Sequence, residues 1–394
     1  MSIWRWLATA LAVLGGLWPA HAGLAHQETG RRPSAGLMLG YYVPYDATSW
    51  ASLQAHASDV DIVAGQWVTI DPCGGLTTRD DQSLKQFAQS RGLMLEPSLF
   101  TASAWLDHRL LTDDASRSAA LQNIVAYTVD EGYDGFDLDL EGVDPSDREA
   151  LTGFVAELGA RLHANGKLLT LALPAKERDV MTGWSGAFDY AALGAQADLV
   201  TIMAYEYRGP FSGPGSVAPY AWVERVATFA SQQIARDKVL LGLAFYGYDW
   251  NTTSGGVLSL GYPRAAALAE HEQAEPGFDA DQRSFTFSYT SEPGDAVPPG
   301  PTAPRPNHQI TTRTSAPCDV VPPSPPPTPR PPTPVPDTPQ AHEVWVEDSQ
   351  SAAARIRLAD GQRLRGIAAW RLGLEDPNVW PLLEQWRQVR DSVP

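Results

Sequence analysis

Eight short apolar runs, each about as long as a buried strand, recur along the chain and alternate with stretches of helical period. A buried parallel strand shows a nearly continuous apolar run and its crossover helix a 3.6-residue period, so this alternation predicts repeated βα units. Eight such units favour an α/β fold of the closed (β/α)8 barrel type, with an open doubly wound sheet as the alternative. The expected strands are residues 37–43, 61–70, 92–100, 134–141, 167–175, 197–205, 238–247 and 364–372.

Two of the intervening stretches carry clear helix signals, residues 80–92 before the third strand and residues 145–166 after the fourth. In the second, Ser146 is expected to cap the helix, because Glu149 follows three residues later in the capping-box spacing. Gly166 lies where this helix should end.

Residues 293–340 differ from the rest of the chain in being rich in proline. This composition predicts extended polyproline II or disordered chain, and it is ordinarily found in interdomain linkers. Residues 342–394, however, hold only one strand-like run with a helix on each side, which fits the eighth βα unit. We therefore interpret 293–340 as an insertion between strands seven and eight of one barrel, residues 36–394, on the face where active sites of such barrels lie.

The N-terminus has the layout of a secretory signal, with a cationic start, an apolar run from Leu7 to Trp18 and a small-residue end at Ala20–Ala22. Cleavage before Gly23, removing residues 1–22, would leave residues 23–35 as a linker. A membrane anchor is the alternative, but the run is shorter than the ~20 apolar residues that span a bilayer. We expect a secreted protein, extracellular or in the cell wall or periplasm, with no membrane attachment after cleavage.

Charge and cysteine content bound the partners further. The formal net charge of −17 argues against nucleic acid, because phosphate binding needs clustered cations. Cys73 and Cys318 are the only cysteines. In an oxidising compartment such a pair can form a disulfide, and two free thiols are the alternative.

Four acids lie within the stretch YDGFDLDLEG, residues 133–142. Strand side chains alternate, so Asp137, Asp139 and Glu141 share one face, which points into a barrel, whereas Asp134 is expected to close the turn before the strand. Three adjacent negative charges repel one another, so at least one acid should hold a proton at neutral pH. Glu141 is nearest the C-terminal mouth of the barrel and fits a general acid of raised pKa.

Two other interpretations of these acids are a solvated strand and a site for a hard cation. Phenylalanine and leucine between the acids argue against a solvated strand. Oxygen ligands suit Mg²⁺ or Ca²⁺, but calcium loops need glycine-broken turns rather than a strand. We expect neither a metal nor a cofactor.

The stretch DGFDLDLE resembles the D-x-x-D-x-D-x-E signature on the fourth strand of family 18 glycoside hydrolases, which include chitinases. The stretch IMAYEYRGPFSGPGSVAP resembles the sixth-strand Met-x-Tyr-acid segment of this family. The stretches LLGLAFYGYDW, HEVWVEDSQS and RGIAAWRLG are similar to the bacterial branch related to spore-cortex and cell-wall glycosidases. The resemblance runs from Leu37 to Trp386, apart from the proline-rich segment. It departs at the third strand, where LMLEPSLF replaces the Ser-x-Gly-Gly pattern of chitinases, and this weighs against chitin as the preferred polymer.

The resemblance implies a retaining, substrate-assisted mechanism, in which the acetamido oxygen of the sugar attacks its own anomeric carbon. Asp139 and Glu141 approach from one strand and cannot act on opposite sides of the bond, as two carboxylates do in other retaining glycosidases. By resemblance, Glu141 is the general acid and base, Asp139 holds the acetamido NH and Asp137 shares its charge. Tyr205 would then donate a hydrogen bond to the acetyl oxygen.

The same resemblance implies a set of substrate-binding residues. Glu206, which is Asp in most chitinases, would orient the distorted sugar, and Met203 belongs to the same sixth-strand segment. Trp370 matches the floor of the sugar site and Tyr41 one wall, because aromatic rings stack on the apolar faces of pyranoses. Core filling is the alternative for both, and Tyr42 is an equal candidate for the wall by spacing.

These features predict a monomeric glycosidase acting on a GlcNAc-containing polysaccharide with β-linked N-acetylhexosamine units, peptidoglycan favoured over chitin. One alternative is a chitinase-like lectin that binds such glycans without cleaving them. Another is a wall-attachment protein built around the proline-rich segment.

Overall fold

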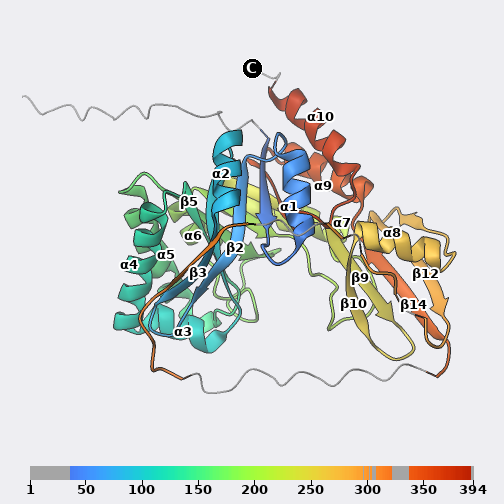
Figure 1. Ribbon diagram of the computed structural model, residues 1–394, viewed down its shortest axis with the longest axis horizontal. Helices are drawn as coiled ribbons and strands as arrows, with labels where there is room; N and C mark the ends of the chain where they lie inside the picture. The colour runs from blue at the N-terminus through green and yellow to red at the C-terminus, as the bar shows by residue number, and fades with distance from the viewer. Residues whose placement is uncertain (1–35, 296, 301, 304–307, 322–336, 392–394) are drawn as a thin grey trace, which may run out of the picture. The chain divides into compact units, whose positions relative to one another are not determined.

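Eight parallel strands of the computed structural model close into a barrel, drawn in Figure 1. Residues 36–295, 297–300, 302–303, 308–321 and 337–391 are described. The strands are β1 (Leu37–Tyr42), β2 (Ile62–Ile70), β4 (Met94–Thr101), β5 (Gly135–Leu140), β6 (Leu168–Pro174), β7 (Leu199–Met203), β8 (Val239–Ala244) and β15 (Gly366–Trp370). Strand β1 pairs with both β2 and β15, so the sheet closes and the (β/α)8 prediction is confirmed over the open sheet.

Two apolar cores follow from the alternation of side chains along these strands. The smaller fills the barrel interior and includes Leu39, Tyr41 and Ala64. The larger lies between the strands and the surrounding helices, where Phe136 and Leu138 of β5 are buried. Acids on β5 therefore share the interior face, and the apolar residues between them face the helices.

The barrel strands are connected mainly through helices that cover the outside of the sheet. Helix α5 shows why, because its buried residues recur at helical spacing along one side, from Leu151 through Phe154, Val155 and Leu158 to Leu162. The helices are α1 (Ala47–His56), α2 (Gln82–Arg91), α3 (Ala104–Thr112), α4 (Asp114–Asp130), α5 (Arg148–His163), α6 (Tyr190–Gln196), α7 (Tyr220–Gln233), α9 (Ser349–Gly361) and α10 (Val379–Asp391), with short 3-10 turns at Pro145–Asp147 and Arg236–Lys238.

The predicted capping box at Ser146 is wrong. Asp144 caps a 3-10 turn instead, accepting hydrogen bonds from the Ser146 backbone NH at 2.9 Å and from its hydroxyl at 2.7 Å. Because the short turn comes first, α5 begins only at Arg148 and has no side-chain cap. The predicted end is confirmed, since Gly166 adopts the left-handed φ of 68° that glycine tolerates best.

An antiparallel sheet is inserted between β8 and β15, with α8 (Tyr262–His271) against it. Its order is β10-β9-β14-β12-β11, and it has its own apolar core. The bounds are β9 (Tyr246–Asn251), β10 (Val257–Gly261), β11 (Gly277–Asp279), β12 (Ser284–Ser291) and β14 (Gln340–Val346). The single run expected at 238–247 is therefore two strands, because the barrel strand ends at Ala244 and β9 starts directly afterwards.

The proline-rich segment returns to the barrel. Strand β13 (Ile310–Thr314) pairs antiparallel with β3 (Leu76–Asp81), which forms a hairpin with β2. Cys73 and Cys318 form a disulfide, so the bridged alternative is correct. The prediction of extended or disordered chain is wrong for β13, because backbone pairing to an open strand edge needs no apolar core, and all five β13 residues are exposed.

The predicted signal peptide and linker, residues 1–35, lie outside the described residues. Within the described part of the chain, no helix has both the length and the hydropathy to cross a membrane.

Candidate active site

The three acids predicted to share a face lie at the mouth of the barrel, Asp137 and Asp139 on β5 and Glu141 directly after it. Asp137 and Asp139 are buried, and Glu141 is partly exposed. Among the described residues, none of the three forms an ion pair with a basic side chain. Three carboxyl groups thus lie close together without a compensating cation.

Asp137 is the deepest of the three and is held by two hydroxyl groups. Ser98 on β4 donates to it at 2.7 Å, and Tyr41 on β1 donates at 3.4 Å. Burial raises the pKa of Asp137 to about 7 despite these two hydrogen bonds. The sequence shows Ser98 only as part of an unusual third strand and assigns it no role. Its hydrogen bond depends on the β4–β5 register, in which Ser98 lies level with Asp137.

Asp139 and Glu141 influence one another. Burial raises the pKa of Asp139 well above its ordinary value, and the charges of Glu141 and Asp137 raise it further. Burial also raises the pKa of Glu141 to about 7, with a second contribution from the Glu206 carboxylate. Asp139 Oδ1 is buried with no hydrogen-bond partner among the described residues, so it can accept a bond from a ligand.

A fourth acid, Glu96 on β4, is fully buried on the same side of β4 as Ser98. Burial raises its pKa to about 8 although the nearby Thr170 hydroxyl lowers it, and neither carboxyl oxygen has a hydrogen bond of ordinary geometry in the described part of the chain. A Cβ atom at Gly135 would lie 2.8 Å from Glu96 Oε1, so the glycine that opens β5 makes room for this carboxyl. Sequence reasoning missed Glu96 because a single acid in an apolar strand has no periodic partner.

Tyr205 and Glu206 follow the end of β7, and Met203 is buried at that end. Burial raises the pKa of Tyr205 well above its ordinary value, and the charges of Asp139 and Glu141 add to the shift, which places this phenol beside the acids. Glu206 has a left-handed φ of 62°, an unfavourable backbone conformation for a residue with a Cβ.

Two tyrosines of the inserted sheet hold the Glu206 side chain. Tyr246 and Tyr248 on β9 both donate to Glu206 Oε1, Tyr248 at 2.5 Å. Neither was identified from the sequence, where both fell in or next to a run assigned to a barrel strand. The inserted sheet therefore positions a predicted binding residue.

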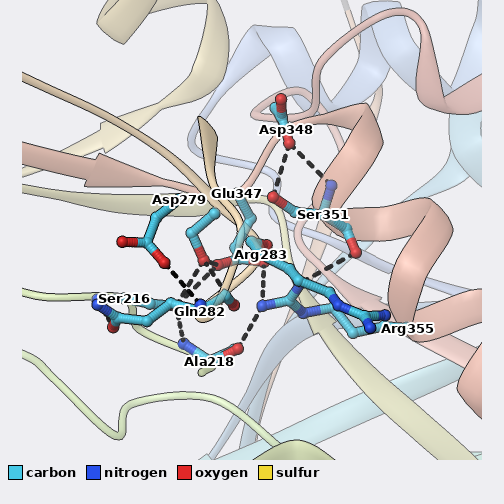
Figure 2. A network of polar contacts seen from close by, with 10 residues as sticks. Ser216, Ala218, Asp279, Gln282, Arg283, Glu347, Asp348, Ser351 and Arg355 are labelled. Atoms are coloured by element: carbon cyan, nitrogen blue, oxygen red, sulfur yellow. Dashed lines mark hydrogen bonds and ion pairs between the residues drawn. The ribbon is translucent and has the colours of Figure 1, made fainter. Parts of the chain in front are cut away.

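A network between the inserted sheet and the loop after β7 supports this arrangement, as Figure 2 shows. Glu347 and Arg355 form a buried ion pair at 2.8 Å. Ser284 donates to Glu347 at 2.7 Å and exchanges a 2.6 Å hydrogen bond with Ser216 of the loop, while Arg355 donates to the Ala218 carbonyl. The loop that begins with Glu206 is thus tied to the sheet at both ends.

Trp370 and Tyr41, predicted to form the floor and one wall of a sugar site, lie in contact with one another. Trp370 ends β15, and the two ring centroids are 5.5 Å apart. Tyr41 belongs to the interior core and Trp370 packs against both cores, whereas Tyr42 belongs to the core outside the barrel. This separates the two tyrosines that spacing alone could not distinguish.

Exposed aromatic residues lie near the C-terminal ends of the barrel strands or on the segments that follow them, and the sequence singled out none of them. Trp184 is half exposed, and its indole NH donates to the Glu141 carbonyl at 2.9 Å. A hollow of about 440 Å³ adjoins Glu141 and Trp184. Such rings can stack on sugars. The exposed aromatic residues of these segments are Tyr45, Phe100, Trp184, Tyr207 and Phe211.

One group of described residues has the spacing of a metal site, Asp71 with Cys73 and Cys318. Both cysteines are in the disulfide, so neither offers the thiolate that binds a metal.

Comparison with known proteins adds to this geometry. The family model described as "Glycosyl hydrolases family 18" matches residues 38–375. The chain is 28% identical over 289 residues to the cortical fragment-lytic enzyme of Bacillus subtilis, covering 72% of this chain but only 57% of that enzyme. It is 23% identical over 367 residues to the uncharacterized glycosylase YvbX of the same species, covering 90% of this chain and 93% of that protein. The crystal structure of a chitinase from Chromobacterium violaceum superposes with a TM-score of 0.72 and 27% identity over 89% of this chain and 98% of that one.

Proposed function

Because the chain belongs to the family 18 glycosyl hydrolases, we propose that it is a secreted glycosidase that cleaves β-linked N-acetylhexosamine polymers with retention of configuration. The observation that carries this proposal is the pKa of about 7 at Glu141, which stands beside an open hollow and next to the unpaired Asp139. A carboxyl of this kind is protonated often enough at neutral pH to act as an acid, and it is basic enough afterwards to act as a base.

In the first step Glu141 gives its proton to the glycosidic oxygen while the bond from that oxygen to the anomeric carbon breaks. The acetamido oxygen of the same sugar forms the new bond to that carbon, giving an oxazolinium ion. Asp139 Oδ1, which lacks a protein partner among the described residues, accepts the acetamido NH, and Tyr205 donates to the acetyl oxygen. Asp137, fixed by Ser98 and Tyr41, shares the proton of the pair.

In the second step the Glu141 carboxylate takes a proton from water, and the water oxygen attacks the anomeric carbon. The ring of the oxazolinium ion opens and the acetamido group is restored. Two inversions at the same carbon give net retention. Each step uses the same carboxyl, so no second carboxylate on the opposite side of the sugar is needed.

Peptidoglycan is the substrate we favour over chitin. One relative is named for lysis of cortical fragments, and the third strand carries Glu96 and Ser98 in place of the chitinase pattern. The N-terminal signal supports export to the place where such a polymer is found.

The test is digestion of purified peptidoglycan and of chitin oligomers by wild type and by Glu141→Gln, with products identified by mass. We expect wild type to release fragments from peptidoglycan and the variant to bind without cleaving. Binding of either polymer by wild type without cleavage would instead support the lectin alternative. Cleavage of a de-N-acetylated oligomer at a rate comparable to its acetylated form would rule out the substrate-assisted mechanism.

A further inference from the structure

A cavity of about 610 Å³ lies over the C-terminal ends of β1, β2 and β4, and nothing above assigns it a role. Phe100 places it beside the acids, because this residue lies level with Asp139 in the β4–β5 register and on the same side of β4 as Ser98. Aromatic rings and two basic side chains line the cavity. The residues of interest are Tyr45, Trp50, Trp67, Phe100, Arg79 and His308.

Arg79 is exposed toward the cavity, and in the described part of the chain it has no hydrogen bond or ion pair. The two acids that line the same cavity are already engaged. Asp46 accepts from Arg371 at 2.6 Å and from the Thr48 backbone NH at 3.0 Å. Asp81 accepts from the Leu84 backbone NH at 3.0 Å and also contacts His308. The Arg79 guanidinium is therefore available to a ligand, in a chain whose net charge is −17.

His308 provides a second group in the cavity that lacks a partner. Its side chain is 9% exposed, and Nδ1 contacts the Asp81 carboxylate, which can only accept when ionised. The other nitrogen, Nε2, is buried with no hydrogen-bond partner among the described residues. The His308 ring packs edge-on against the Trp50 ring, with the two ring centroids 4.4 Å apart, and this contact fixes its orientation. His308 therefore forms a fixed part of the cavity wall.

We propose that this cavity binds the carboxylate-bearing substituent of a sugar next to the one that is cleaved, the lactyl group of a muramic acid residue that carries no peptide. Arg79 faces the carboxylate, His308 lies in the wall beside it, and the aromatic rings face the sugar and its ether substituent. A guanidinium suits this task, because its planar donors match the two oxygens of a carboxylate. Chitin has no such group, so the cavity distinguishes the two polymers. The inference rests on the proposed glycosidase function.

The proline-rich segment helps to build this site. His308 and Ile310 line the cavity and belong to the segment that pairs with β3 through β13. The Cys73–Cys318 disulfide joins the chain on the far side of β13 to the β2–β3 hairpin. One wall of the cavity therefore comes from the insertion and the rest from the barrel.

The kinetic test compares glycan strands that carry muramic acid carboxylates with the same strands after chemical reduction of those carboxylates to alcohols. We expect Arg79→Gln to lower kcat/KM about 10- to 100-fold on the carboxylated strands and less than about twofold on the reduced strands and on chitin oligomers. The matched control is Arg313→Gln, which removes the same charge from the neighbouring strand, where Arg313 pairs with Asp130 and Glu131 instead. Equal losses on all substrates, or no loss on the carboxylated strands, would overturn the proposal.

A binding measurement separates failure of this inference from failure of the proposed function. The Kd of N-acetylmuramic acid and of N-acetylglucosamine is measured by calorimetry with Glu141→Gln and with Glu141→Gln/Arg79→Gln. We expect tighter binding of N-acetylmuramic acid, lost with Arg79 and weakened by salt. If wild type cleaves nothing but this preference is present, only the glycosidase function fails. If wild type cleaves and the two sugars bind equally, only the cavity assignment fails.

Discussion

Two clusters of buried acids in this protein are built in opposite ways. At the barrel mouth Asp137 and Asp139, and deeper in the barrel Glu96, are buried without a basic partner among the described residues. At the junction of the inserted sheet, Glu347 is buried equally but is paired with Arg355 at 2.8 Å and accepts from Ser284. Burial of an unpaired charge is expensive, whereas burial of a paired and hydrogen-bonded charge is tolerated. The difference indicates that the junction maintains structure and that the mouth is kept incomplete for a ligand.

The strongest test of the contrast is at the mouth. We expect Glu141→Gln to lower kcat about 10²- to 10⁴-fold, because the amide cannot transfer a proton, while the melting temperature stays the same or rises. Steady-state hydrolysis and thermal unfolding followed by circular dichroism give the two values. The control is Glu149→Gln on the exposed face of α5, which should change neither. A Glu141→Gln variant that unfolds far below wild type would mean that the mouth is also structural.

The junction should respond in the reverse manner. We expect Arg355→Met to lower the free energy of unfolding by about 3 to 5 kcal/mol, because it leaves the Glu347 carboxylate buried and unpaired. Chemical denaturation measures this loss. The double variant Arg355→Met/Glu347→Leu should recover much of it. If the single variant is as stable as wild type, the ion pair does not hold the sheet to the loop.

Substitution of Glu96 tests how much the buried acids of the barrel, which lack a basic partner among the described residues, lower the free energy of unfolding. Its pKa is about 8 in the fold against an ordinary value of 4.5, so the folded protein holds a proton that the unfolded chain releases between these values. The free energy of unfolding should therefore fall as pH rises through this window, by an amount on the order of a few kcal/mol from this group. In the Glu96→Gln variant the free energy of unfolding should depend less on pH in this window, and the variant should be more stable than wild type above about pH 8. Parallel stability profiles for the two proteins would show that Glu96 does not bear this cost.

The smallest expected effect concerns the coupling between Glu206 and Glu141. Burial raises the pKa of Glu141 to about 7, and the Glu206 charge contributes to the shift. Because the proposed first step needs protonated Glu141, activity should decline above about pH 7. Removing that charge with Glu206→Gln should lower the Glu141 pKa and move the alkaline limb of the kcat profile down by about one pH unit or less. An unchanged limb, measured where substrate is saturating, would show that the Glu206 charge does not affect Glu141.

The barrel and its acids could be predicted because each leaves a periodic pattern. Alternating βα units identified all eight strands, and the spacing of Asp137, Asp139 and Glu141 placed them on one face. The inserted sheet leaves a weaker pattern, since its strands are short and β14 follows the proline-rich segment. Tyr246 and Tyr248 became visible as Glu206 partners only once β9 was separated from β8.

Residues that meet through register or through distant pairing could not be inferred from sequence. Glu96 requires knowledge that Gly135 lies beside it. Arg79 and His308 line the same cavity because β13 pairs with β3, and nothing in either local sequence indicates this pairing. The disulfide could be listed as an option from composition, but its geometry depends on the same strand pairing.

The Cys73–Cys318 disulfide also sets a simple condition for biosynthesis. Because these are the only two cysteines, the chain has one intramolecular pairing to form and no wrong one to undo. Cys73 emerges long before Cys318 during synthesis, so the bridge closes only after both β3 and β13 are available. Maturation therefore requires an oxidant but no disulfide reshuffling, and a host lacking isomerase activity should still produce the bridged protein.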